Sequence, residues 1–249
     1  RVCLDVRPAA AGVCLMTGNI GDLRADLVLA NHILANEEVL DVFGHISVRH
    51  PDKPDRFLLS RSLAPGQVTD ADLMEFDLEG RVTQGDERPY LERFIHSAIY
   101  AARPDVHSVV HHHAASVLPF TLTDQPLKPV FHLGSVAGLQ APLWDSQDDF
   151  GDTSMLVASP EMGASMALGL GDSPTGLLRR HGAICVGPNI RQATFIAICM
   201  RDNAELLLKA LAIGTPDYLS PGEVEKAAKA HDGGRPVQRA WDYWSSRVK

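Results

Sequence analysis

The segment Arg103-Pro104-Asp105-Val106-His107-Ser108-Val109-Val110-His111-His112-His113 decides the fold. The residues before it, 91–102, have a helical pattern, and Arg103-Pro104 closes that helix because the residue before a proline disfavours helical geometry. Residues 107–113 read as a buried strand. A helix joined through a short turn to a buried strand predicts an α/β protein.

The three consecutive histidines divide between the two faces of that strand. Successive side chains of a strand point to opposite faces, so His111 and His113 share one face and His112 points to the other. Buried neutral imidazoles need a partner, and a metal ion is a common one. The pair therefore predicts a metal site, with a functionless histidine-rich tract as the alternative.

Two further segments supply residues for the same site. Glu92 and His96 stand four residues apart, so they share one face of the helix that runs into the histidine strand. Glu92 is a candidate acid/base or ligand, and His96 is either a packing residue or a support for a ligand. His181 is a third candidate imidazole, since it enters the predicted strand 182–187. The alternative for the helix pair is a solvent-facing position.

The rest of the sequence predicts alternating helices and short strands. Helices are expected at 22–42, 161–168 and 189–213 and from Ser220 onward; strands are expected at 45–49 and 56–60, with a hairpin around Gly80. Residues 121–152 should be loop with short strands at 130–133 and 141–144, a helix is allowed from Ala114, and a strand is allowed at 155–158.

Composition excludes several classes of partner. Hydrophobic residues make up 45% of the sequence and charged residues 22%, which suits a globular core. The formal net charge is −8 without a run of basic residues, so neither nucleic acid nor an anionic membrane surface is an expected partner. No run of about 18 apolar residues predicts a membrane span. The four cysteines form no CxxC pair, which fits a reducing cytoplasm.

At 249 residues the sequence is long enough for one sizeable domain. We expect that domain over residues 18–249. Residues 1–17 then form an N-terminal extension, whose flexibility stays open. Asp5, Arg7 and Pro8 interrupt its apolar residues and make it a poor secretory signal.

Five segments taken in order resemble the class II aldolase/adducin superfamily. They are residues 44–49 (Gly-His-Ile-Ser-Val-Arg), 58–62 (Leu-Leu-Ser-Arg-Ser), Glu92 to His96, Arg103-Pro104-Asp105-Val106 leading to His113, and Arg180-His181-Gly182-Ala183. The resemblance spans nearly the whole chain, from Leu23 to Gly222.

That resemblance implies a three-layer α/β/α fold with a mostly antiparallel central sheet. It also implies a divalent metal on His111, His113 and His181, with Glu92 beside it as ligand or acid/base. Zinc is usual in the family, but manganese, iron or cobalt can occupy similar ligands. A homotetramer with active sites at subunit interfaces is implied as well.

Two departures from the sugar phosphate members bear on the substrate. Gly44-His45 replaces their Gly-Asn, and Ser60-Arg61-Ser62 replaces a serine-rich phosphate segment. Arg61 suits a carboxylate, because guanidinium pairs with it through two bonds; a solvated loop residue is the alternative. Segments at 90–96, 130–133, 218–223 and 241–244 resemble a hydroxyaromatic decarboxylase branch.

The resemblance to that branch implies a small-molecule substrate, an ortho-hydroxy aromatic carboxylate or dicarboxylate. The metal would bind its hydroxyl and carboxylate oxygens, Arg61, Ser60, Ser47 and His45 would hold it, and Glu92 or His132 would deliver the proton. One alternative is an aldolase acting on a hydroxy-keto acid or sugar phosphate, with Tyr218 from a neighbouring subunit as acid; Tyr218 is otherwise a packing residue. A second alternative is an adducin-like binding module without catalysis.

Overall fold

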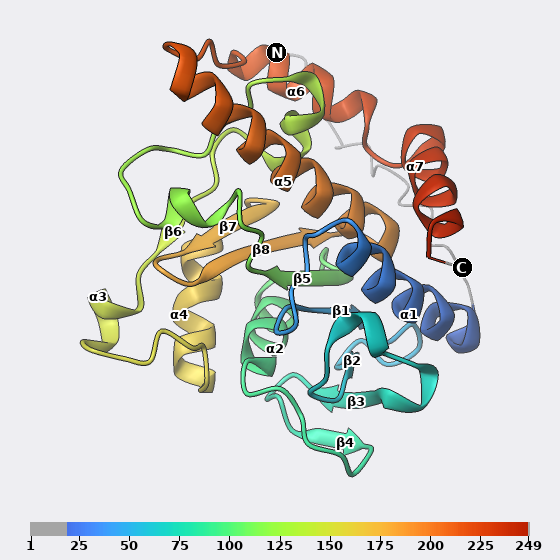
Figure 1. Ribbon diagram of the computed structural model, residues 1–249. Coiled ribbons are helices and arrows are strands. Elements are labelled where there is room, and N and C mark those ends of the chain that lie inside the picture. The colour runs from blue at the N-terminus through green and yellow to red at the C-terminus, as the bar shows by residue number, and fades with distance from the viewer. Residues whose placement is uncertain (1–18, 249) are drawn as a thin grey trace, which may run out of the picture.

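An eight-stranded sheet organises the computed structural model, which describes residues 19–248 (Figure 1). The expected extension over residues 1–17 lies outside this range. The strand order is β4-β3-β2-β1-β5-β8-β7-β6. The strands are β1 (His45–Arg49), β2 (Arg56–Ser60), β3 (Leu73–Asp77), β4 (Val82–Gln84), β5 (Ser108–His112), β6 (Leu143–Trp144), β7 (Thr175–Leu178) and β8 (Gly182–Gly187). Within residues 19–248 only β6 and β7 pair in parallel, so the expected mostly antiparallel sheet is confirmed.

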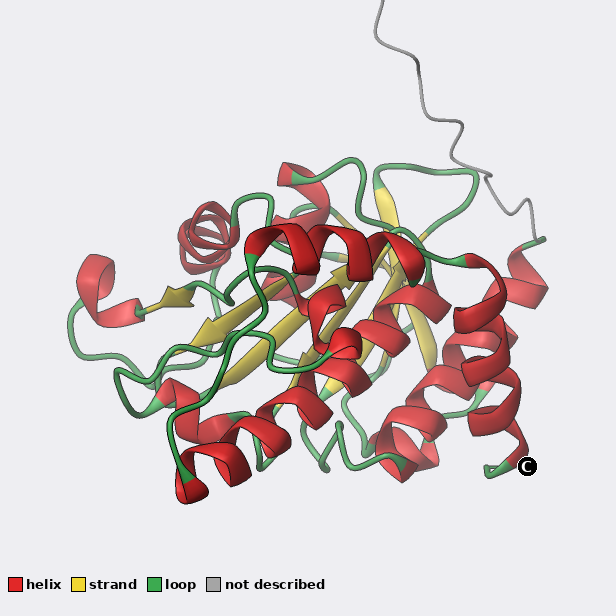
Figure 2. Cartoon of the chain, turned by 90° about the horizontal axis from the view of Figure 1, so that it is seen from above, coloured by secondary structure: helices red, strands yellow, loops and turns green. Residues whose placement is uncertain are grey.

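Helices cover both faces of the sheet (Figure 2). They are α1 (Ile20–Asn36), α2 (Arg93–Ala102), α3 (Ser146–Phe150), α4 (Pro160–Leu170), α5 (Ile190–Ile213), α6 (Pro221–Ala230) and α7 (Gly234–Ser246). The alternation of strand side chains builds two cores: Val110 and Cys185 face α1, α5 and α7, whereas Val109 and Ile184 face α2 and α4. The three-layer α/β/α arrangement follows from these two cores.

Side-chain caps explain where several helices begin. Asn19, Ser159, Asn189 and Ser220 each accept a hydrogen bond from a backbone N–H of the first helical turn. The start expected at Ser220 is confirmed, with Glu223 completing a capping box. No helix within residues 19–248 is long and apolar enough to span a membrane.

The first helix is shorter than its apolar pattern predicts. It ends at Asn36 rather than at Val42, because the chain turns at Glu38, which has a φ of 56°. Asp41 then caps the end of this turn: its Oδ1 accepts hydrogen bonds from the backbone N–H groups of Phe43 and Gly44. The result is a loop that leads into β1 and places Asp41 near the histidine strand.

Four other expectations differ from the structure, and one strand was not expected. Residues 114–117 form no α-helix, and a 3-10 helix (Leu118–Thr121) follows them. The strands expected at 130–133 and 155–158 are absent; a 3-10 helix (His132–Ala137) lies at the first position and an irregular segment at the second. Strand β7 was not predicted, because four residues carry little periodic signal. The C-terminal helix is split into α6 and α7 at Gly233 and Gly234, both of positive φ.

Candidate metal centre

Four side chains from separate parts of the chain meet beside the start of β8. Glu92 is the N-cap residue of α2, His111 lies in β5, His113 follows β5, and His181 precedes β8. The antiparallel register, which pairs His111 with Ile184 and His112 with Ala183, carries His181 to the end of β5. One ligand atom from each of the four side chains lies within 4.8 Å of the others.

The inner atoms of this cluster are Nε2 nitrogens and one carboxylate oxygen. His111 Nε2 and His113 Nε2 are 3.1 Å apart. Glu92 Oε2 lies 3.5 Å from His111 Nε2 and 3.5 Å from His181 Nε2. The second oxygen of Glu92, Oε1, accepts a hydrogen bond of 3.0 Å from the backbone N–H of Val157, which fixes the carboxylate in place.

Outer hydrogen bonds decide which ring nitrogens carry protons. His111 Nδ1 lies 3.1 Å from the carbonyl oxygen of Ala183, and His113 Nδ1 lies 3.1 Å from Asp41 Oδ1. A carbonyl and a carboxylate can only accept, so each Nδ1 carries a proton, and in the neutral form of each ring Nε2 keeps a lone pair. Two lone pairs 3.1 Å apart repel each other unless a cation lies between them. The donor set therefore fits a metal ion.

The protonation states of Glu92 and His111 also suit metal binding. Burial lowers the pKa of His111 to about 4, although Glu92 acts against this shift. Burial alone would raise the pKa of Glu92, but His111 and His181 outweigh it and hold that pKa well below its usual range. At neutral pH the carboxylate is ionised and the His111 ring is neutral, which are the forms that bind metal.

A glycine lets the two strands approach closely at the cluster. A Cβ on Gly182 would lie 2.5 Å from the backbone oxygen of His112 and 2.7 Å from His113 Cδ2. Any larger residue would push the ring of His113 out of its position. The His181-Gly182 pair thus serves the site twice, with a ligand and with the space that a neighbouring ligand needs.

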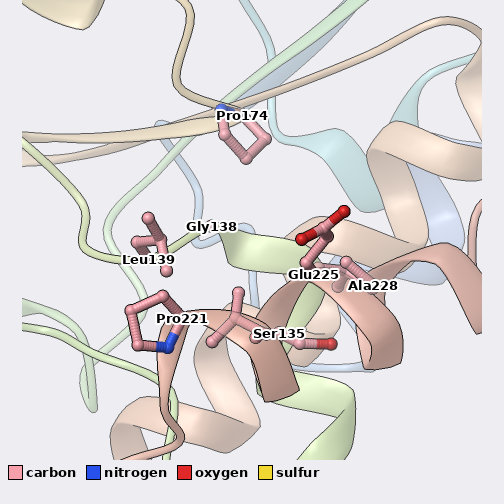
Figure 3. Close-up of a pocket in the computed structure, with 10 residues that line it drawn as sticks. Ser135, Gly138, Leu139, Pro174, Pro221, Glu225 and Ala228 are labelled. Carbon is pink, nitrogen blue, oxygen red and sulfur yellow. The ribbon is translucent and has the colours of Figure 1, made fainter.

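The cluster opens into a cavity of about 520 Å³. Glu92, His113 and His181 line it on one side, and residues of the segments 42–45, 62–64 and 88–91 line the rest, with Leu156. A second cavity of about 480 Å³ lies between α6 and the 3-10 helix 132–137 (Figure 3). Its lining, which includes Leu139, Pro174 and Pro221, is mainly apolar, so the chemistry-bearing groups belong to the first cavity.

The residues expected to hold a substrate lie at different depths. His45 lines the cavity, whereas Ser47 is fully buried and its hydroxyl contacts His96 and Tyr100. Ser60 is also fully buried, and its Oγ has no hydrogen-bond partner within residues 19–248. The predicted alternation of the histidines is confirmed: His112 lies on the other side of β5, against Cys185.

Arg61 has a partner inside the protein. Its Nε donates a hydrogen bond of 2.6 Å to Asp72 Oδ1, and Arg61 is not among the residues that line the cavity. Arg88 does line it, although its position in a polar loop gave no sequence signal. Asp41 is a second functional candidate without a signal, because the apolar pattern assigned it to the first helix.

Two expected catalytic residues, His132 and Tyr218, lie away from the cluster. His132 is exposed and its ring packs against His231, at a centroid distance of 5.6 Å. The hydroxyl of Tyr218 accepts a hydrogen bond of 2.7 Å from Gln125 Nε2. Neither residue lines the cavity at the cluster, so within one chain they are not brought to Glu92.

Comparison with known proteins identifies the family. The model of the class II aldolase and adducin N-terminal domain matches residues 25–208, a span that contains all four residues of the cluster. The chain belongs to the class II aldolase and adducin family. Its resemblance in sequence, carried by the histidine segments, is thereby confirmed.

Relatives of this class II aldolase-family chain include decarboxylases and aldolases. Decarboxylase tropJ from Talaromyces stipitatus is 33% identical over 243 residues, which cover 88% of this chain and 91% of that protein. The 3,4-dihydroxyphthalate decarboxylase from Arthrobacter keyseri is 27% identical over 239 residues, covering 90% and 93%. L-fuculose phosphate aldolase from Escherichia coli O157:H7 is 27% identical over 173 residues, covering 70% and 76%. All three named activities belong to lyases.

Solved structures share the class II aldolase fold. L-fuculose 1-phosphate aldolase from Glaciozyma antarctica superposes with a TM-score of 0.76 at 24% identity, over 91% of this chain and 88% of that one. An aldolase II superfamily protein from Pseudomonas syringae gives a TM-score of 0.77 at 22% identity, over 91% and 92%.

Proposed function

We propose that the protein is a metal-dependent lyase that removes carbon dioxide from an ortho-hydroxy aromatic carboxylate or dicarboxylate. The observation that carries this proposal is the cluster of Glu92, His111, His113 and His181, whose potential ligand atoms converge beside a cavity. The decarboxylase relatives, which match over nine-tenths of their length, favour this reaction over other lyase reactions.

Three imidazoles and one carboxylate fit zinc, manganese, iron or cobalt, so the donor set leaves the metal open. A divalent ion there would supply a Lewis acid that stabilises negative charge on substrate oxygens. Asp41 and the Ala183 carbonyl would orient the rings of His113 and His111 for this task. Glu92 would serve either as a fourth ligand or as the acid/base; because it is ionised, it would first take the proton of the substrate's ring hydroxyl and then deliver that proton to the ring carbon.

Arg88 is our candidate for holding a carboxylate of the substrate. It lines the cavity, and no ion pair to another side chain occupies its guanidinium among the described residues. Arg61, the expected residue, is bound to Asp72 and would have to leave that partner to reach a substrate. A guanidinium free of internal partners binds a planar carboxylate without that cost.

A homo-oligomer would give His132 and Tyr218 a place in catalysis. Both lie outside the cavity of their own chain, so each would have to act in the cavity of a neighbouring copy. We propose a homo-oligomer, a tetramer by resemblance, with active sites at subunit interfaces. A substitution of Tyr218 or His132 that lowers turnover without altering the metal content would support this arrangement.

An aldolase is the second candidate, favoured by the L-fuculose phosphate aldolases among the relatives. The products that the protein releases distinguish a decarboxylase from an aldolase. Protein loaded with manganese, zinc or iron is assayed for carbon dioxide on ortho-hydroxy aromatic dicarboxylates and for aldehyde on hydroxy-keto acids and sugar phosphates. Carbon dioxide supports the decarboxylase, and aldehyde alone supports the aldolase. Bound metal without either product would point to an adducin-like binding module.

A further inference from the structure

Four buried polar side chains form a row that runs from the core to the cavity. Tyr100 Oη lies 2.7 Å from Ser47 Oγ, Ser47 Oγ lies 2.6 Å from His96 Nδ1, and His96 Nε2 lies 2.7 Å from His45 Nδ1. Each of the four side chains is at most 1% exposed. We call these four residues the polar row.

The core end of the polar row sets the direction of its hydrogen bonds. The phenol of Tyr100 has one proton to donate, and Ser47 Oγ is the acceptor within reach. A buried O–H without an acceptor is unfavourable, so Tyr100 donates to Ser47. The single hydroxyl proton of Ser47 must then point to its other neighbour, His96 Nδ1.

The same direction of donation fixes the proton positions on both histidines. His96 Nδ1 accepts from Ser47, so the neutral ring of His96 carries its proton on Nε2 and donates it to His45 Nδ1. His45 Nδ1 is an acceptor as well, which leaves the proton of His45 on Nε2. Since Nδ1 is turned towards His96 and His45 lines the cavity, this N–H lies on the cavity side.

We propose that the polar row fixes the proton of His45 on Nε2, so that His45 offers a neutral N–H donor to an anionic oxygen of the substrate. The donor stands next to the metal cluster: the rings of His45 and His111 have centroids 5.2 Å apart. The tautomer follows from this protein's own hydrogen bonds, whereas the substrate oxygen rests on the proposed function.

The chemistry of such a donor limits what it can bind and do. A neutral imidazole N–H is a hydrogen-bond donor and a very weak acid, so it does not deliver the proton to carbon. It stabilises negative charge on a carboxylate, phenolate or enolate oxygen as that charge develops. His45 would thus donate a hydrogen bond to an anionic oxygen of the substrate. Ser47, His96 and Tyr100 are positioning residues that orient the His45 ring.

Nitrogen NMR of the histidine rings tests the tautomer without any assay of activity. Zinc-loaded protein with ¹⁵N-labelled histidine is measured at neutral pH, and the variants His45→Gln and His96→Gln assign the signals. We expect a protonated Nε2 and an unprotonated Nδ1 for both rings. A His45 ring protonated on Nδ1 overturns the proposal.

Two serines of neighbouring strands provide a matched pair of variants. Ser47→Ala removes the donor to His96, whereas Ser108→Ala removes an equally buried hydroxyl that bonds only the backbone oxygen of Ser47. Ser47→Ala should give mixed tautomers at His45 and lower kcat about tenfold with little change in KM, below the roughly 10²–10³-fold loss of a whole donor. Ser108→Ala should do neither.

The outcomes separate this inference from the proposed function. If Ser47→Ala leaves the His45 proton on Nε2 and kcat unchanged, the polar row has no directing role. If the tautomer is as proposed but no substrate on the panel releases carbon dioxide, the decarboxylase proposal fails and the polar row stands.

Discussion

One carboxylate oxygen of Glu92 accepts a hydrogen bond from the backbone N–H of Val157, and the other faces the imidazoles of His111 and His181. Glu92→Gln keeps an acceptor for Val157 but removes the negative charge and the group that could take up and release a proton. We expect the metal content to stay intact, because three imidazoles remain, and turnover to fall about 10²–10⁴-fold. Metal analysis and steady-state kinetics check this. Loss of the metal would instead make Glu92 a ligand.

The two arginines near the cavity give opposite predictions. Arg88→Ala should raise KM about 10–100-fold, the loss of a charged hydrogen bond, with a smaller change in kcat. Arg61→Ala should leave KM close to the wild-type value, because its guanidinium is bound to Asp72. Kinetics of the two variants on one carboxylate substrate decide between them, and a larger KM effect at Arg61 would restore that residue as the carboxylate binder.

The element that depends most on local space is the junction of β5 and β8. Gly182→Ala should displace His113 and lower metal affinity at least tenfold, a loss typical of disturbed ligand support. Gly176→Ala in β7 is the control, since its Cβ would come within 3.0 Å of the end of the Leu170 side chain and make only an ordinary contact of 3.9 Å with the backbone oxygen of Pro142. Metal titration of both variants measures the effect. Equal affinities would show that the close approach is unimportant.

Periodicity predicted most of the elements and few of their exact ends. The bounds of β1, β2 and β8 agree with the sequence because each is a short extended segment between turn residues. The first helix was too long, because its apolar spacing continues past the turn that Glu38 and Asp41 make. Strand β7 was missed, since only its pairing with β8 distinguishes it from loop.

Local spacing predicted the His111 and His113 pair, and the family resemblance implied His181 and Glu92 beside it, but contacts between distant segments complete the site. His111 and His113 share a face by strand geometry alone. Asp41, Arg88 and the polar row reach their positions through folding; the contact of Asp41 with His113, for example, joins residues 72 positions apart. The roles expected of His132 and Tyr218 depend on a second copy of the chain and stay predictions.

Buried neutral histidines make the whole molecule sensitive to acid. Burial lowers the pKa of His96 from 6.5 to about 3, so the unfolded chain binds a proton there before the folded protein does. The stability that neutral His96 contributes is present above pH 6.5 and is lost as the pH falls towards 3. This amounts to about 2 kcal/mol by about pH 5.

Urea unfolding of EDTA-treated protein at several pH values measures this loss. The variant His96→Gln has no titrating group at that position. Its free energy of unfolding should therefore fall less per pH unit than that of the wild type, by a slope that corresponds to at most one bound proton. Identical slopes for the two proteins would mean that His96 does not titrate differently in the folded state.

The central claim is that lyase activity requires a metal on the Glu92, His111, His113 and His181 cluster. EDTA-treated protein is titrated with manganese while bound metal and carbon dioxide release are followed together, beside His111→Ala and the opposite-face control His112→Ala. We predict that release rises in step with metal to one ion per chain, that His111→Ala binds no metal at this site, and that His112→Ala still binds it. Undiminished release from metal-free protein, or full metal binding by His111→Ala, would contradict the account.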